Sequence, residues 1–288
     1  MMKLVQRIVL EYYKIKFKVI ELLSPVKAAE AAFELFCTPY SRQRNYAVPM
    51  VFEQAEKLSF IIQHLKIKGF RWKPEAPNGS KILICHGFDS SSYRFERYIS
   101  PLLKNGFEVL AFDAPAHGVS SGKTINALLY SEVILEIISA FGPVDTIIAH
   151  SFGGIAAALA FEKSEKNRVK KLVLAAPATE TTRSLNDFCR YLSISDKLKK
   201  GLERLIVQVG GQSASWFSVA RIIQAITIPV LWIHDKKDRI TPYEDMEFLT
   251  KLNLPHVRFI ITDGLGHSLY RDDNIAEEII AFICNLKC

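Results

Sequence analysis

The sequence predicts an α/β fold in which a mostly parallel sheet is flanked by helices on both faces. From about residue 81 onward, short apolar runs alternate with segments whose apolar residues recur at helical spacing, as expected for strands joined by crossover helices. A serine at position 151 stands between one such run, Val144 to Ile148, and a segment of small residues. The 288 residues are 49% hydrophobic, which is enough for a single large core.

The antiparallel part of the sheet is expected first along the chain. Residues 65–72 should pair with the stretch around Phe60 to Ile62, and their alternation of apolar and polar residues shifts at Gly69. The parallel part follows, with strands at 81–86, 107–112, 144–150, 169–176, 228–234 and 257–262, and with helices at 93–105, 125–141 and 152–163.

The segment Ala149-His150-Ser151-Phe152-Gly153-Gly154 is typical of a strand that turns sharply into a helix. A serine on such a turn projects its hydroxyl above the sheet edge, and its neighbours must be small because larger side chains would strike adjacent elements. The pattern is small-x-Ser-x-Gly, with Ala149 where a glycine is usual. Ser151 is therefore the candidate nucleophile, provided that an acid and a histidine follow.

Both follow in the order that such a sheet requires, each just after a strand. The apolar run 228–234 leads into Asp235-Lys236-Lys237-Asp238, so either aspartate is a candidate acid. The run 257–262 leads into Asp263-Gly264-Leu265-Gly266-His267, which places His267 at the same edge of the sheet. His150 and His234 are expected to pack and form hydrogen bonds around this site.

A third segment completes the predicted chemistry. The strand at 81–86 ends in His86-Gly87-Phe88, and a His-Gly turn there lets the next backbone N–H point into the site. The tetrahedral intermediate of acyl transfer carries a negative oxygen that prearranged donors must meet. We assign the backbone N–H groups of Phe88 and Phe152 to that oxyanion hole.

Five blocks together resemble the α/β-hydrolase superfamily over about residues 60–288. They are His86 to Phe88, Phe112 to Gly122, His150 to Gly154, His234 to Pro242 and Gly264 to His267. The second block looks like that of lysophospholipase, monoacylglycerol lipase and serine aminopeptidase relatives, which implies that Asp113 and His117 are architectural. The resemblance also implies that Asp238 is the acid and leaves Asp235 as the lesser candidate.

Two segments fall outside the minimal fold. Residues 1–58 are predicted as an amino-terminal helical extension, and residues 59–288 as the α/β-hydrolase domain. Within that domain, residues 179–226 are predicted as an insertion with two helices, which the resemblance implies is a small lid over the serine. Trp216 and Phe217 in this insertion either line an acyl pocket or pack inside the lid.

The amino-terminal segment is expected to form an amphipathic helix. Its apolar stripe consists of Leu4, Ile8, Tyr12, Ile15, Val19 and Leu22, and Lys3, Arg7, Lys14 and Lys18 fall elsewhere on the helix. No apolar run there reaches the ~18 residues of a membrane span. Three roles stay open: packing on the domain or the rim of the active site, weak contact with an anionic membrane surface, or dimerisation.

Charge and cysteine usage limit the partners and cofactors. The net charge of +7 comes from scattered lysines without a recognisable nucleic-acid module, so no nucleic-acid partner is expected. The five cysteines are widely spaced and form neither a zinc pattern nor a disulfide framework, which indicates a reducing, cytoplasmic location. No metal or organic cofactor is expected.

The sequence thus predicts a serine hydrolase that cleaves a carboxylic ester or thioester through an acyl-enzyme. Ser151 attacks a small acyl substrate, His267 takes its proton, Asp238 orients His267, and the Phe88 and Phe152 N–H groups hold the oxyanion. The oligomeric state is open. A prolyl-type aminopeptidase, an acyltransferase and a non-catalytic binding module are the alternatives, whereas serine at the turn argues against haloalkane dehalogenation.

Overall fold

The computed structural model describes residues 4–40, 47–163 and 169–285. The chain divides into two compact units. Unit 1 contains Met1–Thr38 and Glu180–Ser218, and unit 2 contains Pro39–Thr179 and Val219–Cys288. Unit 1 thus joins the first part of the amino-terminal extension to most of the insertion, two segments that the sequence predicts as separate additions.

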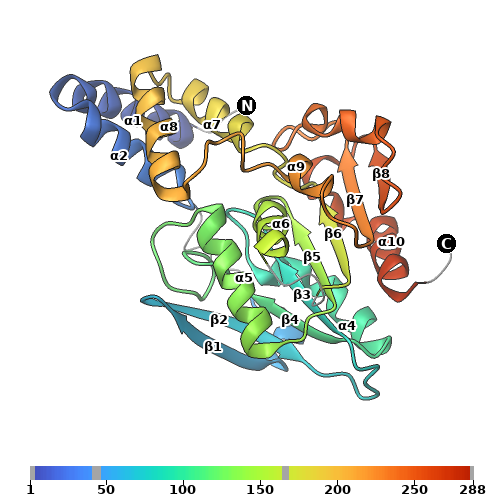
Figure 1. The fold of residues 1–288 in the computed structure, drawn as a ribbon. Helices are drawn as coiled ribbons and strands as arrows, with labels where there is room; N and C mark the ends of the chain where they lie inside the picture. The colour runs from blue at the N-terminus through green and yellow to red at the C-terminus, as the bar shows by residue number, and fades with distance from the viewer. Residues whose placement is uncertain (1–3, 41–46, 164–168, 286–288) are drawn as a thin grey trace. The chain divides into compact units, whose positions relative to one another are not determined.

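The described part of unit 2 contains an eight-stranded sheet (Figure 1) with the order β1-β2-β4-β3-β5-β6-β7-β8. The strands are β1 (Glu56–Ile62), β2 (Leu65–Trp72), β3 (Lys81–Cys85), β4 (Glu108–Phe112), β5 (Thr146–His150), β6 (Lys171–Ala175), β7 (Val230–Asp235) and β8 (Val257–Thr262). Strand β2 pairs antiparallel with β1 and β4, and the remaining pairs are parallel. The predicted fold class is confirmed.

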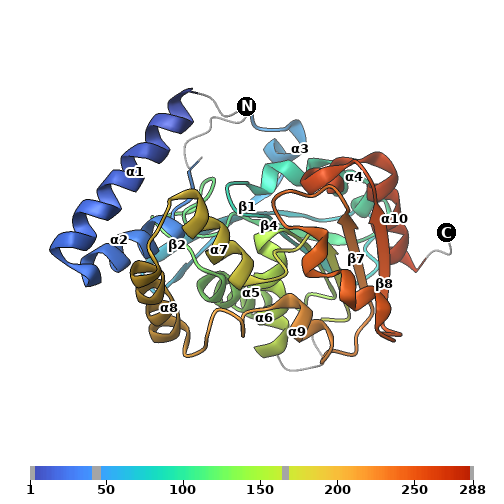
Figure 2. The ribbon, with the colours of Figure 1, turned by 90° about the horizontal axis from the view of Figure 1, so that it is seen from above.

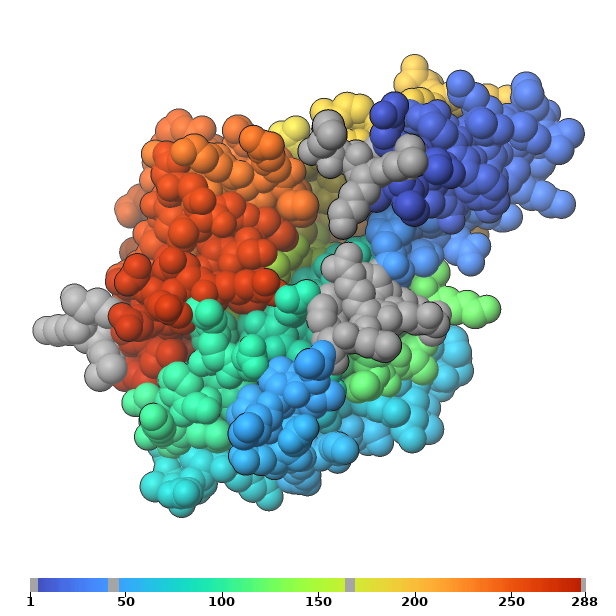
Figure 3. Space-filling model, turned by 180° about the vertical axis from the view of Figure 1, so that it is seen from behind, coloured from blue at the N-terminus to red at the C-terminus, as the bar shows by residue number. Residues whose placement is uncertain are grey.

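Helices cover both faces of this sheet. They are α3 (Met50–Glu53), α4 (Glu96–Lys104), α5 (Ala127–Phe141), α6 (Phe152–Lys163), α9 (Val219–Ile223) and α10 (Asp273–Cys284), with short 3₁₀ turns η1 (Ser92–Phe95), η2 (Tyr243–Asp245), η3 (Glu247–Lys251) and η4 (Gly266–Arg271). Helices α4 and α10 pack together, and α5, α6 and α9 form a second group. The red carboxyl-terminal segment lies beside blue-green atoms of the region around residue 100 in Figure 3. Arg97 of α4 pairs with Asp273 of α10 at 2.7 Å.

The strands are apolar because both of their faces are buried. Ile82 and Ile84 of β3 pack in one core cluster with Tyr98 of α4 and Ile279 of α10, while the intervening residue Leu83 is also fully buried. In a parallel sheet covered by helices on both sides, the sequence of each strand is therefore continuously apolar and does not alternate between apolar and polar residues.

The shift in alternation at Gly69 has a packing cause. A Cβ at this position would lie 2.3 Å from the Cδ1 atom of the Phe112 ring on the neighbouring strand β4. Gly69 and Phe112 are direct partners in the antiparallel register. The glycine therefore makes room for a large aromatic side chain beside it.

Unit 1 is built of helices. They are α1 (Leu4–Leu23), α2 (Pro25–Phe36), α7 (Thr181–Tyr191) and α8 (Asp196–Gly210). Ser24 separates α1 from α2: its hydroxyl accepts the Lys27 N–H at 3.3 Å, and Pro25 suits the first turn of the new helix. Figure 2 shows α1 as one unbroken helix that meets α2 at its carboxyl end.

Helices α2 and α8 approach each other closely. Ala28, Ala29 and Ala32 of α2 are buried, and a Cβ on Gly201 of α8 would lie 2.8 Å from Ala29 Cβ. Small side chains on both helices thus allow the contact. In the part of the chain that the structure describes, no helix is long and apolar enough to cross a membrane.

Candidate active site

Ser151 lies at the turn between β5 and α6, where the small-x-Ser-x-Gly pattern places it. Its backbone φ is 54°, a left-handed value that costs a non-glycine residue about 1 to 2 kcal/mol. The surrounding backbone holds this conformation: the Ser151 N–H donates to the Ala175 carbonyl at 3.1 Å, and the Ser151 carbonyl accepts from Gly154 at 2.8 Å and from Ala178 at 2.9 Å. A strained turn fixed from both sides is what a serine nucleophile between a strand and a helix requires.

The two glycines after Phe152 are required by close approach of the backbone. A Cβ on Gly153 would lie 2.5 Å from the Cys85 carbonyl oxygen, and a Cβ on Gly154 would lie 2.6 Å from Pro177 Cβ. Neither contact can be relieved by a flexible side chain. The prediction that small residues must follow the serine is confirmed.

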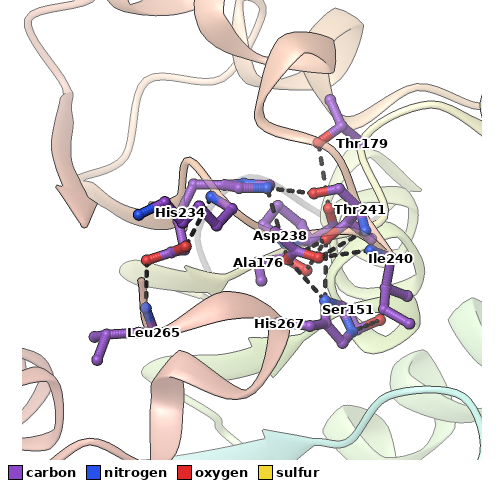
Figure 4. A network of polar contacts seen from close by, with 12 residues as sticks. Ser151, Ala176, Thr179, His234, Asp238, Ile240, Thr241, Leu265 and His267 are labelled. Atoms are coloured by element: carbon purple, nitrogen blue, oxygen red, sulfur yellow. Dashed lines mark hydrogen bonds and ion pairs between the residues drawn. The ribbon is translucent and has the colours of Figure 1, made fainter. Parts of the chain in front are cut away.

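The structure brings Ser151, His267 and Asp238 together beyond the carboxyl ends of β5, β8 and β7 (Figure 4). His267 Nε2 lies 3.0 Å from Ser151 Oγ, and His267 Nδ1 lies 2.8 Å from Asp238 Oδ2. One neutral tautomer satisfies both contacts, because Nδ1–H donates to the carboxylate and Nε2 accepts from the hydroxyl. This is the geometry of a nucleophile, a base and an acid that orients the base.

The carboxylate of Asp238 is buried and fully hydrogen bonded. Besides the contact to His267, Oδ1 accepts the N–H groups of Ile240 at 2.8 Å and Thr241 at 3.0 Å. Burial opposes the charged form, but the hydrogen bond and charge of His267, together with these backbone donors, outweigh it and lower the pKa of Asp238. The carboxylate therefore stays ionised beside the imidazole.

Asp235 has a different environment. Its Oδ1 accepts the Lys237 N–H at 2.8 Å, and its Oδ2 accepts the Thr262 hydroxyl at 2.6 Å and the Leu265 N–H at 2.8 Å. Burial works against the charge, but these donors outweigh it, so the pKa of Asp235 is well below its usual range. Asp235 thus ties the loops after β7 and β8 together and makes no hydrogen bond to His267.

Thr241 is a site residue to which the sequence analysis assigned no role. Its hydroxyl donates to Asp238 Oδ2 at 2.9 Å and lies 3.2 Å from His267 Nδ1 and 3.2 Å from the Ala176 carbonyl. The hydroxyl therefore helps to hold the acid and the base in position relative to each other. The available signal was its position between Asp238 and Pro242 in the fourth of the matching blocks.

His150 and His234 hold the backbone of the site, as predicted. His150 Nε2–H donates to the His267 carbonyl at 2.9 Å, and His234 Nε2–H donates to the Thr241 carbonyl at 2.6 Å. Burial lowers the pKa of His150 to about 3 and also lowers the pKa of His234. Both imidazoles are therefore neutral supports for the loops that carry His267 and Asp238.

The predicted oxyanion-hole residues lie beside the nucleophile. A Cβ on Gly87 would lie 3.0 Å from Ser151 Cβ, and the rings of Phe88 and Phe152 contact edge to face with centroids 5.4 Å apart. Neither the Phe88 N–H nor the Phe152 N–H has a hydrogen-bond partner among the described residues. Two unpaired backbone donors near a serine hydroxyl are suited to hold a negative oxygen.

Two buried histidines fix the loop that contains Phe88. His86 Nδ1–H donates to the Gly87 carbonyl at 2.8 Å. Because the carbonyl and the next N–H of a trans peptide point in opposite directions, this bond turns the Phe88 N–H away from His86. On the carboxyl-terminal side of Phe88, the Asp89 N–H donates to His117 Nε2 at 3.0 Å.

Asp113 holds the adjacent turn rather than the reacting groups. Its Oδ1 accepts the N–H and hydroxyl of Ser92, both at 2.8 Å, and its Oδ2 accepts the Val119 N–H at 2.9 Å. A Cβ on Gly118, whose φ is 47°, would lie 2.0 Å from that carboxylate. The architectural roles expected for Asp113 and His117 agree with these contacts.

Over the described residues, no group of three or more His, Cys, Asp or Glu side chains is arranged to hold a metal ion.

Comparisons with known proteins agree with the fold. The family described as alpha/beta hydrolase fold matches residues 81–193. An uncharacterized protein of Bacillus subtilis, YqkD, is 28% identical over 227 residues, which cover 74% of this chain and 74% of that protein.

Solved structures of hydrolases also superpose on the chain. The Pyrococcus furiosus esterase Pf2001 has a TM-score of 0.62 and 19% identity, covering 87% of this chain and 98% of the esterase. The thioesterase domain from the curacin biosynthetic pathway has a TM-score of 0.57 and 18% identity, covering 80% of this chain and 98% of that domain. The chain therefore has the α/β-hydrolase fold, and the predicted resemblance to that superfamily is confirmed.

Proposed function

We propose that the protein is a serine hydrolase that cleaves a carboxylic ester or thioester through an acyl-enzyme. The observation that carries the proposal is the chain of contacts from Ser151 Oγ to His267 Nε2 at 3.0 Å and from His267 Nδ1 to Asp238 Oδ2 at 2.8 Å. It is supported by the left-handed backbone of Ser151 and by the unpaired N–H groups of Phe88 and Phe152.

In the acylation step, Ser151 Oγ attacks the substrate carbonyl carbon while His267 Nε2 takes the hydroxyl proton. Asp238 stabilises the resulting imidazolium, and the Phe88 and Phe152 N–H groups bind the oxyanion. Collapse of this intermediate breaks the bond to the alkoxide or thiolate, which leaves with the proton from His267. Ser151 then carries the acyl group as an ester.

Deacylation repeats the same steps with water as the nucleophile. His267 takes a proton from water, the hydroxide adds to the acyl carbon, and the proton returns to Ser151 Oγ as the carboxylic acid is released. No cofactor takes part in this scheme. The two solved neighbours named above as an esterase and a thioesterase support the choice of ester and thioester substrates on this fold.

The substrate class is tested with substrates that differ in the bond to be cleaved. The purified protein is assayed against an aryl ester, an alkyl thioester and an aminoacyl amide, and Ser151→Ala serves as the control for background hydrolysis. We expect turnover of esters or thioesters to exceed turnover of the amide. Release of amino-terminal residues from peptides alone would favour an aminopeptidase, and product formed only when an alcohol acceptor is added would favour an acyltransferase.

A further inference from the structure

The predicted apolar stripe of α1 is exposed in the structure. Its described side chains, Ile8, Tyr12, Ile15, Val19 and Leu22, are between 51% and 87% exposed, and the side chain of Leu4 lies outside the described residues. Helix α1 packs on α2, and Phe17, which helical spacing places opposite the stripe, is buried. Both sides of α1 are thus apolar, and among the described residues of unit 1 only one of them is covered. Contiguous apolar exposure of this kind marks an interaction surface.

The spacing of the exposed residues matches a helix that pairs with another helix. From Val5 onward they recur at alternating steps of three and four: Val5, Ile8, Tyr12, Ile15, Val19 and Leu22. In a heptad, Val5, Tyr12 and Val19 take position a, whereas Ile8, Ile15 and Leu22 take position d. A regular apolar a/d repeat is typical of coiled coils, and valine at a with leucine at d, as for Val19 and Leu22, favours two strands.

The charges beside this seam are complementary to a second copy of the same helix. In that heptad Glu11 and Lys18 fall at position g and Lys16 at position e, the positions that form ion pairs between helices. A parallel pair would bring Glu11 near Lys16 of the other copy, and an antiparallel pair would bring it near Lys18. In both cases opposite charges meet.

A membrane surface fits these observations less well. Helices that lie in a membrane interface have a strongly charged face opposite the apolar one, but the face of α1 opposite the stripe carries buried Phe17. Two of the flanking cations also have contacts within the helix: Lys14 pairs with Glu11 at 2.8 Å, and the Lys16 ammonium lies 5.5 Å from the centre of the Tyr13 ring. Pairing with a second copy would require Glu11 and Lys16 to exchange these exposed contacts for contacts between helices.

We propose that α1 pairs with α1 of a second copy of this chain, with the seam formed by Val5, Ile8, Tyr12, Ile15, Val19 and Leu22. The pairing is independent of the proposed hydrolase activity, because none of these residues belongs to the candidate active site. It makes the protein a symmetric dimer, since the same surface is used by both copies.

Sedimentation equilibrium of the full chain at micromolar concentrations tests this proposal. The wild-type protein should be a dimer, and Ile15→Asp should raise the dissociation constant about 100-fold or more, because two carboxylates would be buried in the seam. Val209→Asp in α8 is the matched control: Val209, like Ile15, is an exposed β-branched residue of unit 1, but it lies outside the seam, so this variant should leave the dimer intact. Circular dichroism verifies that both variants are folded.

Charge exchange gives a second, independent readout. Glu11→Lys alone should weaken self-association, because the new lysine would face Lys16 or Lys18 of the other copy and repel it. Mixing this variant with the double variant Lys16→Glu/Lys18→Glu should restore mixed dimers. A monomeric wild-type protein, or a dimer that Ile15→Asp leaves unchanged, would overturn the proposal. So would a monomer that binds phosphatidylserine vesicles and loses that binding in Ile15→Asp, which would establish the membrane role instead.

Discussion

The carboxylate of Asp235 binds the backbone of the histidine loop and not the histidine: its Oδ2 accepts the Leu265 N–H at 2.8 Å, two residues before His267. Asp238, three residues farther along, accepts the His267 Nδ1–H at 2.8 Å. The aspartate that ends β7 and the aspartate in the loop after it therefore have separable tasks. Asp235 fixes where the loop lies, and Asp238 fixes how the imidazole is oriented.

This difference predicts that one amide substitution lowers catalytic turnover and that the other lowers stability. Asp238→Asn should lower kcat by about 10⁴-fold, as loss of the tautomer-fixing acid does in serine proteases. Asp235→Asn should instead lower the free energy of unfolding by about 2 kcal/mol, because it removes charge-assisted hydrogen bonds from a buried group. Ester kinetics and urea unfolding of both variants measure these effects. A larger loss of kcat in folded Asp235→Asn than in Asp238→Asn would reverse the assignment of the acid.

The left-handed conformation of Ser151 predicts an effect on stability. Ser151→Ala and Ser151→Gly both remove the hydroxyl, but only glycine adopts a φ of 54° without strain. Glycine also increases the entropy of the unfolded chain, so the net gain of Ser151→Gly over Ser151→Ala should be up to about 1 kcal/mol. Denaturant unfolding of the two inactive variants gives this difference directly. If Ser151→Gly is the less stable variant, the turn is not strained.

The bond from the Asp89 N–H to His117 predicts a role in positioning the oxyanion hole. His117→Ala should lower kcat by about 10- to 100-fold with little change in KM, because the Phe88 N–H matters most in the transition state. His64→Ala, at an exposed histidine, is the control and should behave like the wild type. An unchanged kcat in folded His117→Ala would mean that this contact does not position the donor.

The buried histidines predict how stability depends on pH. Burial lowers the pKa of His86 and of His117 to about 4, and that of His150 to about 3, from 6.5. The unfolded chain therefore binds protons first as the pH falls, so their contribution to stability is complete above pH 6.5 and is lost progressively below it. Each histidine adds at most about 1.4 kcal/mol per pH unit to this loss. Urea unfolding at pH 7, 6 and 5 measures it, and a flat profile over that range would contradict the burial of these groups as neutral imidazoles.

Much of unit 2 follows from local sequence pattern. The buried strands appear as apolar runs because parallel strands are covered on both faces, and the sharp turn at Ser151 is visible because its neighbours Gly153 and Gly154 must be small. Ser151, Asp238 and His267 could be nominated because each follows a different strand, and parallel strands bring such positions to one edge. The role of Thr241 was not predicted: the residue lies in one of the matching blocks, but a threonine hydroxyl has no distinctive spacing that would indicate its partners.

The sequence did not allow a prediction of which chain segments form unit 1. Its two segments, Met1–Thr38 and Glu180–Ser218, are far apart in the chain, and their association depends on side-chain packing such as that of Ala29 against Gly201. Hydrophobic periodicity predicts which side of a helix is apolar, but it does not specify which element covers that side. For the same reason, the amphipathic pattern of α1 did not reveal that its stripe would be exposed.

The most direct test of the proposed chemistry is labelling by a fluorophosphonate probe, followed by mass spectrometry of the modified peptide. The phosphorus traps an activated serine covalently, and the phosphonyl oxygen occupies the place of the oxyanion. We predict that the probe modifies Ser151, and that Ser151→Ala and His267→Ala lose both labelling and ester hydrolysis while remaining folded. A folded wild-type protein that neither reacts with the probe nor hydrolyses any ester or thioester would contradict the account and favour a non-catalytic binding module.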